Sequence, residues 1–419
     1  MASATNPVSV LPPERLAAVA GKVRENIGRL LFYAVTFEGA LFGSGRLLPI
    51  GPVTVRMVLY VLAVIFTIWS LLFLVRLKRS TVLLLVSFAV LLCFGICNGL
   101  GHAADLQNLG QDVSPLAAFL LIPFFELTIR TEGDIRTAMR IIVAAASIMA
   151  AGYAVIVFSL VMHLVSFVSF YAWIGRVGGD DFIFEGDATF LFYKGSIFIA
   201  IAFIFLIFRK GRWAKTGAFV LFLSLFAIGT RGFFLALALC AILYVFIAPL
   251  PVVKKLGLGF AVFSVALVLL PWIFSLSGDK AVSNETRLTA MSEVAARVSA
   301  GSFFLGHGFG IGVPIRPVHM EIVYLEIVHK QGVLALIWWA ILIGMAIARL
   351  RRALKAGQGD LAYPLLLAAI FICFESATNP FLNNPIGMYP FLICFVGLGV
   401  LADTGRETRP GMRMEEQKA

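Results

Sequence analysis

The sequence has too few charged side chains for a soluble protein of its size. Of its 419 residues, 14% are charged and 60% are hydrophobic, whereas soluble domains carry about 25% charged residues. A water-soluble fold this large needs more polar surface than these residues provide. The composition therefore excludes a soluble globular protein and indicates one that is embedded in a membrane.

The chain also lacks the signs of a barrel and of a leader. Its apolar runs show no alternation of polar and apolar residues, which argues against the strands of an outer-membrane barrel. Residues 1–25 contain no apolar stretch of the signal-peptide type. We therefore expect the first apolar run, residues 27–42, to be a retained helix.

Cysteines are few, and each lies within an apolar run. None has neighbours typical of a metal site, and their spacing indicates no disulfide framework. We interpret them as small packing residues of the spans. The five are Cys93, Cys97, Cys240, Cys373 and Cys394.

Long apolar runs predict an all-α polytopic membrane protein with about 12 transmembrane helices. A helix needs about 20 predominantly apolar residues to cross the hydrocarbon core. The predicted spans are 27–43, 53–75, 80–99, 114–129, 138–164, 189–208, 216–230, 232–249, 256–275, 322–348, 361–378 and 386–402.

The net charge of +11 lies largely in short connections between the spans. Arginine and lysine are concentrated at every second connection, and such connections face the cytoplasm. This pattern places both termini in the cytoplasm and explains the charge without a nucleic-acid partner. The chain then divides into a cytoplasmic N-terminal segment (1–26), helices one to nine (27–275), a large outer loop (276–321), helices ten to twelve (322–402) and a cytoplasmic tail (403–419).

The large outer loop has a sequence that favours folded structure. Connections longer than about 15 residues are uncommon unless they are functional or disordered. Within it, apolar residues at Leu288, Met291, Val294 and Val298 predict a helix over 285–300. A glycine-rich turn follows, and we expect a small helical cap on the outer face.

Arg231 is the outer-face cation that is hardest to explain by topology. It stands in the sequence IGTRGF (228–233), with apolar segments on both sides. An arginine at a membrane edge is costly unless it extends to the headgroups or meets a partner. The functional interpretation is a phosphate site, because the planar donors of a guanidinium group bind phosphate oxygens in pairs.

Two further residues of the predicted outer face are suited to glycan chemistry. Arg287 opens the predicted loop helix, where either a surface ion pair with Glu285 or a phosphate contact accounts for it. His319 directly precedes the tenth span. Because histidine can accept a proton at neutral pH, His319 is a candidate general base, with an interfacial polar side chain as the alternative.

The sequence GHGFGIG (306–312) lies between these two residues. No Lys-Ser or Lys-Thr pair follows it, so it is not a phosphate-binding loop of the P-loop type. We interpret its glycines as supplying unusual backbone angles and His307 as part of the turn.

A different chemical centre is conceivable in the outer connection 165–188. Its carboxylates could bind a divalent ion that neutralises a diphosphate, although acids are also common in solvated loops. Lys194 and Arg176 lie nearby and either pair with these acids or add phosphate-binding charge. The acids are Asp180, Asp181, Glu185 and Asp187.

The order of these motifs resembles the O-antigen ligase and polymerase superfamily. The resemblance covers about residues 225–345, and the helix count fits the rest of the chain. It is carried by Thr230-Arg231-Gly232, Arg287, Gly308-Phe309-Gly310-Ile311-Gly312, His319, Tyr324-Leu325-Glu326-Ile327 and Gly332.

The resemblance implies a GT-C-type membrane glycosyltransferase that needs neither metal nor cofactor. Such enzymes transfer a glycan from undecaprenyl pyrophosphate at the periplasmic face of the bacterial inner membrane. It further implies that Arg231 and Arg287 hold the pyrophosphate and that His319 activates the acceptor hydroxyl. In the family the histidine often lies nearer the tyrosine-leucine pair, and that spacing falls on Glu321, which is the alternative base.

We favour a ligase, whose acceptor is the lipid A core, because one outer loop is much longer than the others. A polymerase, whose acceptor is a second lipid-linked glycan, is the nearest alternative. A lipid or glycan transporter is the alternative from another class. Glu38 and Glu126 lie within spans, but the two halves of the chain show no repeat of the kind that transporters have.

Overall fold

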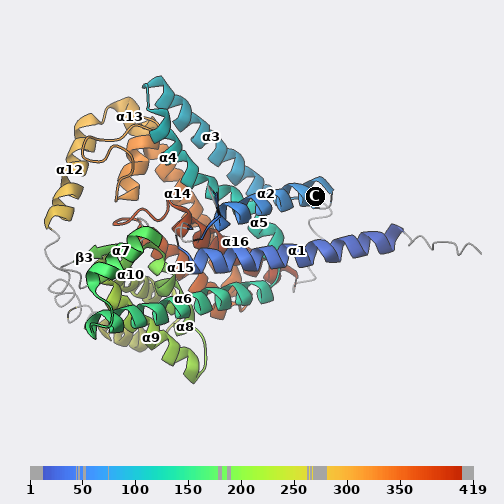
Figure 1. Ribbon diagram of the computed structural model, residues 1–419. Coiled ribbons are helices and arrows are strands. Elements are labelled where there is room, and N and C mark those ends of the chain that lie inside the picture. The colour runs from blue at the N-terminus through green and yellow to red at the C-terminus, as the bar shows by residue number, and fades with distance from the viewer. Residues whose placement is uncertain are drawn as a thin grey trace, which may run out of the picture.

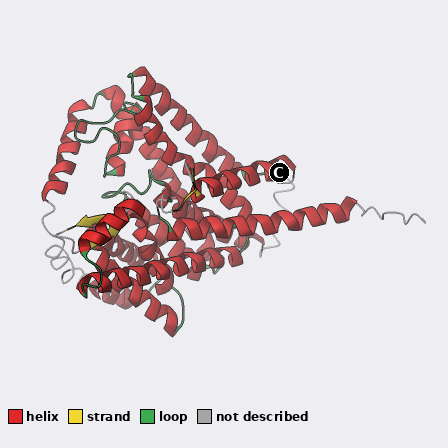
Figure 2. Cartoon of the chain, viewed as in Figure 1, coloured by secondary structure: helices red, strands yellow, loops and turns green. Residues whose placement is uncertain are grey.

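The computed structural model describes residues 13–43, 45, 48–50, 53–73, 75–177, 182–185, 190–261, 264, 267 and 281–407. Within them the regular structure is almost entirely helical (Figure 2). The strands form two small antiparallel pairs, β1 (Pro49–Ile50) with β2 (Val53–Thr54) and β3 (Phe182–Glu185) with β4 (Phe190–Tyr193).

The helices account for most of the predicted spans and for parts of the connections. In chain order they are α1 (Pro13–Leu41), α2 (Val55–Phe73), α3 (Arg79–Gly101), α4 (Leu106–Leu116), η1 (Ala117–Leu121), α5 (Ile122–Thr128), α6 (Glu132–Val161), α7 (Phe167–Val177), η3 (Lys194–Ser196), α8 (Ile197–Ile207), α9 (Arg212–Ile228), α10 (Arg231–Ile247), α12 (Ala281–Arg297), α13 (Ala300–Leu305), α14 (Val323–Lys355), α15 (Gly359–Glu375) and α16 (Pro385–Glu407).

Five helices are long and apolar enough to cross a membrane, namely α2, α3, α6, α14 and α16. Large apolar side chains face outward from α2 and α3; Leu72 is 71% exposed and Val90 is 62% exposed. Water solvates such a surface poorly, whereas lipid chains solvate it well. The chain is therefore a helical membrane protein, and the 12 crossings remain a prediction.

The centre of the molecule is formed by α15 and α16 (Figure 1). The apolar segment of α16 is 89% buried, because α14 and α15 pack along it and α5 and η1 contact it. On its other side α15 packs against α8 and α10. Helices therefore pack around α15, and nearly all of its described side chains are buried.

The start of the first helix differs from the prediction. It begins at Pro13, not at residue 27, because the intervening sequence is rich in Ala, Leu, Glu and Arg, which favour helix. Proline suits the first helical position, where its missing N–H is not needed. The predicted N-terminal segment 1–26 is therefore largely helical where it is described.

The predicted fourth span, 114–129, is not a single helix. It consists of the end of α4, then η1, then α5. Pro115 and Pro123 lack the N–H that a continuous helix requires, so the chain tightens and restarts at these points. The sixth span also starts late, at Ile197, because β4 and η3 precede it. Most of the ninth span, 256–275, lies outside the described residues.

The helix predicted in the large outer loop is present as α12, but only part of the predicted apolar face is buried. Leu288 and Met291 are exposed, whereas Ala290 and Val294 pack against Val313 and Met320. Because Arg287 precedes Ala290 by three positions, burying this face also turns the arginine toward the chain after α13. Figure 1 shows α12 and α13 beside the ends of α3, α4 and α14.

A buried ion pair joins α1 to α2. Glu38 Oε2 accepts a hydrogen bond from Arg56 Nε at 2.9 Å, and the two side chains are 5% and 7% exposed. Replacing Glu38 with Leu leaves Arg56 buried without a counter-charge, so we expect the free energy of unfolding to fall by about 3–5 kcal/mol.

Denaturant unfolding in detergent micelles measures this loss. Glu25→Leu is the matched control, because Glu25 pairs with Arg29 at 2.8 Å on the same helix but both side chains are at least 41% exposed. The control is expected to cost at most about 1 kcal/mol. Equal losses in the two variants would show that burial of the Glu38 pair has no particular weight.

Candidate functional site

The glycine-rich turn connects α3, α4 and α14. Gly308 has φ 95°, and a Cβ there would lie 2.0 Å from the backbone nitrogen of Gly99. Only glycine permits this approach, as the sequence predicted for this stretch. Two backbone N–H groups of the turn donate hydrogen bonds to α14: His307 to the His329 carbonyl at 2.8 Å, and Gly308 to the Lys330 carbonyl at 2.9 Å.

A kink in α14 makes those two carbonyls available. Gly332 interrupts the helix with φ 77° and ψ 176°, so the usual bonds to the preceding turn are lost. The glycine-rich turn replaces them. His307 also supports this junction, since its ring nitrogens lie 3.1 Å from the His329 carbonyl and 3.2 Å from the Arg297 carbonyl. His307 thus belongs to the turn.

A buried cluster of three charged side chains lies beneath this turn. Lys330 Nζ on α14 is 2.7 Å from Asp112 Oδ1 on α4 and 2.6 Å from Glu326 Oε1 on α14, and all three side chains are at most 4% exposed. The Val318 carbonyl also accepts from this ammonium group. We call Asp112, Glu326 and Lys330 the charged cluster; when all are ionised its net charge is −1.

The remaining carboxylate oxygens are held by neighbouring donors. Gly310 N–H donates to Asp112 Oδ2 at 2.8 Å, and Asn383 Nδ2 donates to Glu326 Oε2 at 3.3 Å. Burial raises the pKa of Asp112, while the Lys330 ammonium group and the Gly310 N–H act in the opposite direction. The carboxylates are therefore fixed in position from several elements.

His319 lies over the charged cluster. Its Nδ1 is 3.6 Å from Asp112 Oδ1 and 3.6 Å from Glu326 Oε1, and its side chain is 46% exposed. These separations are slightly longer than a hydrogen bond, as is common in catalytic sites before substrate binds. A histidine with one nitrogen directed at buried carboxylates and an exposed ring is suited to proton transfer, because the carboxylates stabilise the imidazolium ion that forms.

The same three ligand types, Asp112, His319 and Glu326, are close enough together to hold a metal ion. The facing oxygens of both carboxylates, however, already bind the Lys330 ammonium group. A cation here would have to displace a buried lysine that is 1% exposed. The geometry therefore fits a lysine-compensated cluster better than a metal centre.

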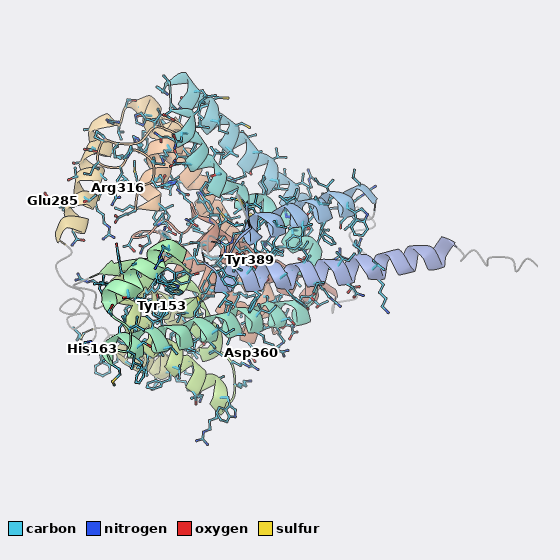
Figure 3. All side chains as sticks on the ribbon, in the orientation of Figure 1. Tyr153, His163, Glu285, Arg316, Asp360 and Tyr389 are labelled. Carbon is cyan, nitrogen blue, oxygen red and sulfur yellow. The ribbon has the colours of Figure 1, made fainter. Side chains whose placement is uncertain are left out.

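Arg287 lies on α12 and is oriented by Glu321. Its Nε donates to Glu321 Oε2 at 2.7 Å, whereas its Nη1 and Nη2 make only long contacts, 3.5 Å to Asn284 Oδ1 and 3.4 Å to the Thr378 carbonyl. Glu321 Oε1 accepts from Arg316. One carboxylate thus holds two guanidinium groups, each more than a quarter exposed, at a shallow pocket (Arg316 and Glu285 are labelled in Figure 3).

Arg231 is the first residue of α10, which is a helix separate from α9. Its neighbour Gly232 packs on Glu375 and Thr378, since a Cβ there would lie 2.6 Å from Glu375 Oε1 and 2.9 Å from Thr378 Oγ1. Arg287 contacts the Thr378 carbonyl. The chain around Thr378, just after α15, therefore connects the start of α10 with the arginine of α12.

No protein-family model matches this chain, and no curated protein sequence matches it.

Some sequence candidates are not joined to this site. Arg176 is exposed on α7, where its Nε donates to the Ala172 carbonyl at 3.2 Å. Lys194 begins η3 ahead of α8. Among the described residues, neither contacts Arg231, Arg287 or His319. Asp180, Asp181 and Asp187 lie outside the described residues, as does the side chain of Glu185, so the acidic alternative is not described.

The structure adds residues that the sequence did not single out. Asp112 and Lys330 are separated by 218 positions, and Arg316 stands in the loop after the glycines. A signal was present, because a lysine within the apolar tenth span is costly and implies a buried partner. The identity of that partner could not be read from the sequence.

Proposed function

We propose that this protein is an inverting glycosyltransferase of the O-antigen ligase type. It ligates O-antigen polysaccharide from undecaprenyl pyrophosphate onto the lipid A core in lipopolysaccharide biosynthesis, at the periplasmic face of the bacterial inner membrane. The observation that carries this proposal is the half-exposed His319 over a buried, net-negative cluster, two residues before Glu321, whose carboxylate holds Arg287 and Arg316. A base beside two phosphate-binding forks suits attack on a diphosphate-activated sugar.

In this reaction His319 takes the proton of the acceptor hydroxyl. The acceptor oxygen forms a bond to the anomeric carbon, and the bond from that carbon to the pyrophosphate oxygen breaks on the opposite side, so the anomeric centre inverts. The electron pair leaves with undecaprenyl pyrophosphate. The charged cluster, with net charge −1, balances the proton that His319 has gained.

The arginines stabilise the leaving diphosphate. Glu321 fixes the Arg287 plane through Nε, so Nη1 and Nη2 are already oriented when a phosphate replaces their long contacts. Arg231 contributes from the start of α10, whose helix dipole also favours an anion. Because Glu321 is engaged by two guanidinium groups, it suits a positioning role better than that of the base.

Reconstitution tests the activity and its acceptor. Purified protein in liposomes, given an undecaprenyl-pyrophosphate-linked glycan and a lipid A core, is expected to produce core-linked glycan detectable by gel shift and mass spectrometry. Omitting the core is expected to leave the donor unchanged. A ladder of lengthened lipid-linked glycan without core would instead identify a polymerase, and the ligase assignment would be wrong.

Arg287→Gln is expected to lower kcat/KM for glycan transfer by about 10²–10³-fold, because it removes charge and donors from the developing diphosphate anion. Arg287→Lys restores the charge without the planar fork, so we expect it to recover only part of the loss. Steady-state transfer with purified variants measures both. Full activity in Arg287→Gln would remove this residue from the diphosphate site.

A further inference from the structure

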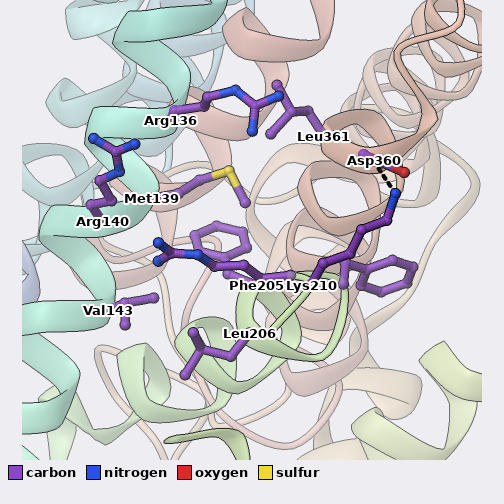
Figure 4. A pocket seen from close by; sticks show the side chains of 11 residues that line it. Arg136, Met139, Arg140, Val143, Phe205, Leu206, Lys210, Asp360 and Leu361 are labelled. Atoms are coloured by element: carbon purple, nitrogen blue, oxygen red, sulfur yellow. Dashed lines mark ion pairs between the residues drawn. The ribbon is translucent and has the colours of Figure 1, made fainter. Parts of the chain in front are cut away.

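A second polar site lies at the opposite end of α15 from His319. The first turn of α15, the first turns of α6, the end of α8 and the turn that follows it line an open cavity of about 290 Å³ (Figure 4). Asp360 at this end and Arg316 at the other lie far apart in Figure 3. This volume is near the lower limit for small-ligand pockets, roughly 300 Å³. The cavity is remote from the proposed transfer site, and nothing in the proposed function uses it.

Four cations surround this cavity. Arg136 and Arg140 are one turn apart on α6, and Arg209 and Lys210 follow α8. Arg136 pairs with Glu132 on its own helix, and Lys210 Nζ lies 3.5 Å from Asp360 Oδ2 in a pair that is largely exposed. Within the described chain, no acidic side chain lies within ion-pair distance of Arg140 or Arg209. The cavity therefore has an excess of positive charge.

The floor of the cavity is apolar. Phe205 and Leu206 of α8 and Leu361 of α15 are buried there, and Met139 lies between the two α6 arginines. Figure 4 shows Arg140 on one side and Lys210 paired with Asp360 on the other, with the apolar side chains between them. A basic rim above an apolar floor is complementary to an anion that carries a hydrocarbon chain.

We propose that this cavity binds the phosphodiester headgroup of an anionic phospholipid, with its glycerol and first acyl carbons on the apolar floor. Guanidinium groups bind phosphate oxygens in pairs, and basic pockets between transmembrane helices hold anionic lipid headgroups in this way. A soluble phosphate gains nothing from Phe205 or Leu361. The basic connections place the cavity in the cytoplasmic leaflet of the predicted topology, where its lipid would brace α6 against α15.

Native mass spectrometry of the delipidated full-length protein in detergent tests this assignment. One molecule of phosphatidylglycerol is expected to bind to each protein molecule, and to bind more tightly than phosphatidylcholine. Arg140→Gln/Arg209→Gln is expected to weaken that binding roughly tenfold. The matched control is Arg351→Gln/Arg352→Gln, which removes the same charge from exposed positions on α14, outside the cavity, and should retain binding. Both pairs are exposed, so the variants are expected to fold as the wild-type protein does.

Four outcomes would overturn the proposal. Unchanged binding of phosphatidylglycerol in Arg140→Gln/Arg209→Gln would show that these arginines do not hold the headgroup. Equal weakening in the control would show charge attraction without a site. Phosphatidylcholine could bind as tightly, which would show an apolar groove only. Glycerol 3-phosphate could displace the lipid at equal concentration, which would identify a site for soluble phosphates.

Discussion

His319→Ala is expected to lower kcat for glycan transfer by about 10²–10⁴-fold, the contribution usual for a positioned general base. The side chain is 46% exposed and makes no close hydrogen bond among the described residues, so its removal should leave the fold intact. Core-linked glycan formed per minute by the reconstituted protein measures the effect. KM for the lipid-linked donor is expected to change little, because the arginines and not His319 hold the diphosphate.

His102→Ala is the matched control for that result. His102 directly follows α3 and is exposed, and within the described structure the hydrogen bond of its ring is to the Asn98 carbonyl, at 2.9 Å. It faces the same predicted side of the membrane, so its loss should leave transfer unchanged. If His319→Ala kept wild-type kcat while Glu321→Gln abolished transfer, the base would be Glu321 and His319 would not be the group that accepts the proton.

The sequence was sufficient for the features that depend on local composition. Apolar runs predicted most long helices, because a helix that crosses the membrane needs about 20 consecutive residues whose side chains are predominantly apolar. The loop helix α12 followed from spacing alone, and the role of the glycine-rich turn followed from residue type. His319 and Arg231 were selected because each is a polar residue at the border of an apolar segment, which is visible without a structure, whereas Arg287 was selected chiefly through the family resemblance.

Features that depend on distant pairing were not predictable. Lys330 and Asp112 meet across 218 positions; the lysine within an apolar span implies a buried partner, but the sequence does not identify Asp112 as that partner. The buried face of α12 was predicted only in part: Val294 is buried as expected, but Leu288 and Met291 are exposed and the smaller Ala290 is buried. Because Arg287 precedes Ala290 by three positions, burial of Ala290 also directs Arg287 toward Glu321.

Lys330→Met is expected to reduce the free energy of unfolding by about 3–5 kcal/mol, because it leaves two buried carboxylates with no counter-charge. Lys330 is 1% exposed and its ammonium group contacts both Asp112 and Glu326. Denaturant unfolding in micelles measures the loss. Lys355→Met, at the exposed end of the same helix, removes the same charge and is expected to change stability by less than about 0.5 kcal/mol.

A triple variant separates stability from chemistry in this cluster. Lys330→Met/Asp112→Asn/Glu326→Gln contains no buried charge, so most of the lost stability should return. Transfer should nevertheless stay slow, because neutral amides beside His319 do not stabilise an imidazolium ion as the carboxylates do. If the triple variant recovered both stability and wild-type kcat, the cluster would serve only the fold. If the triple variant recovered stability but not kcat, the negative charge beneath His319 would serve proton transfer and not the fold.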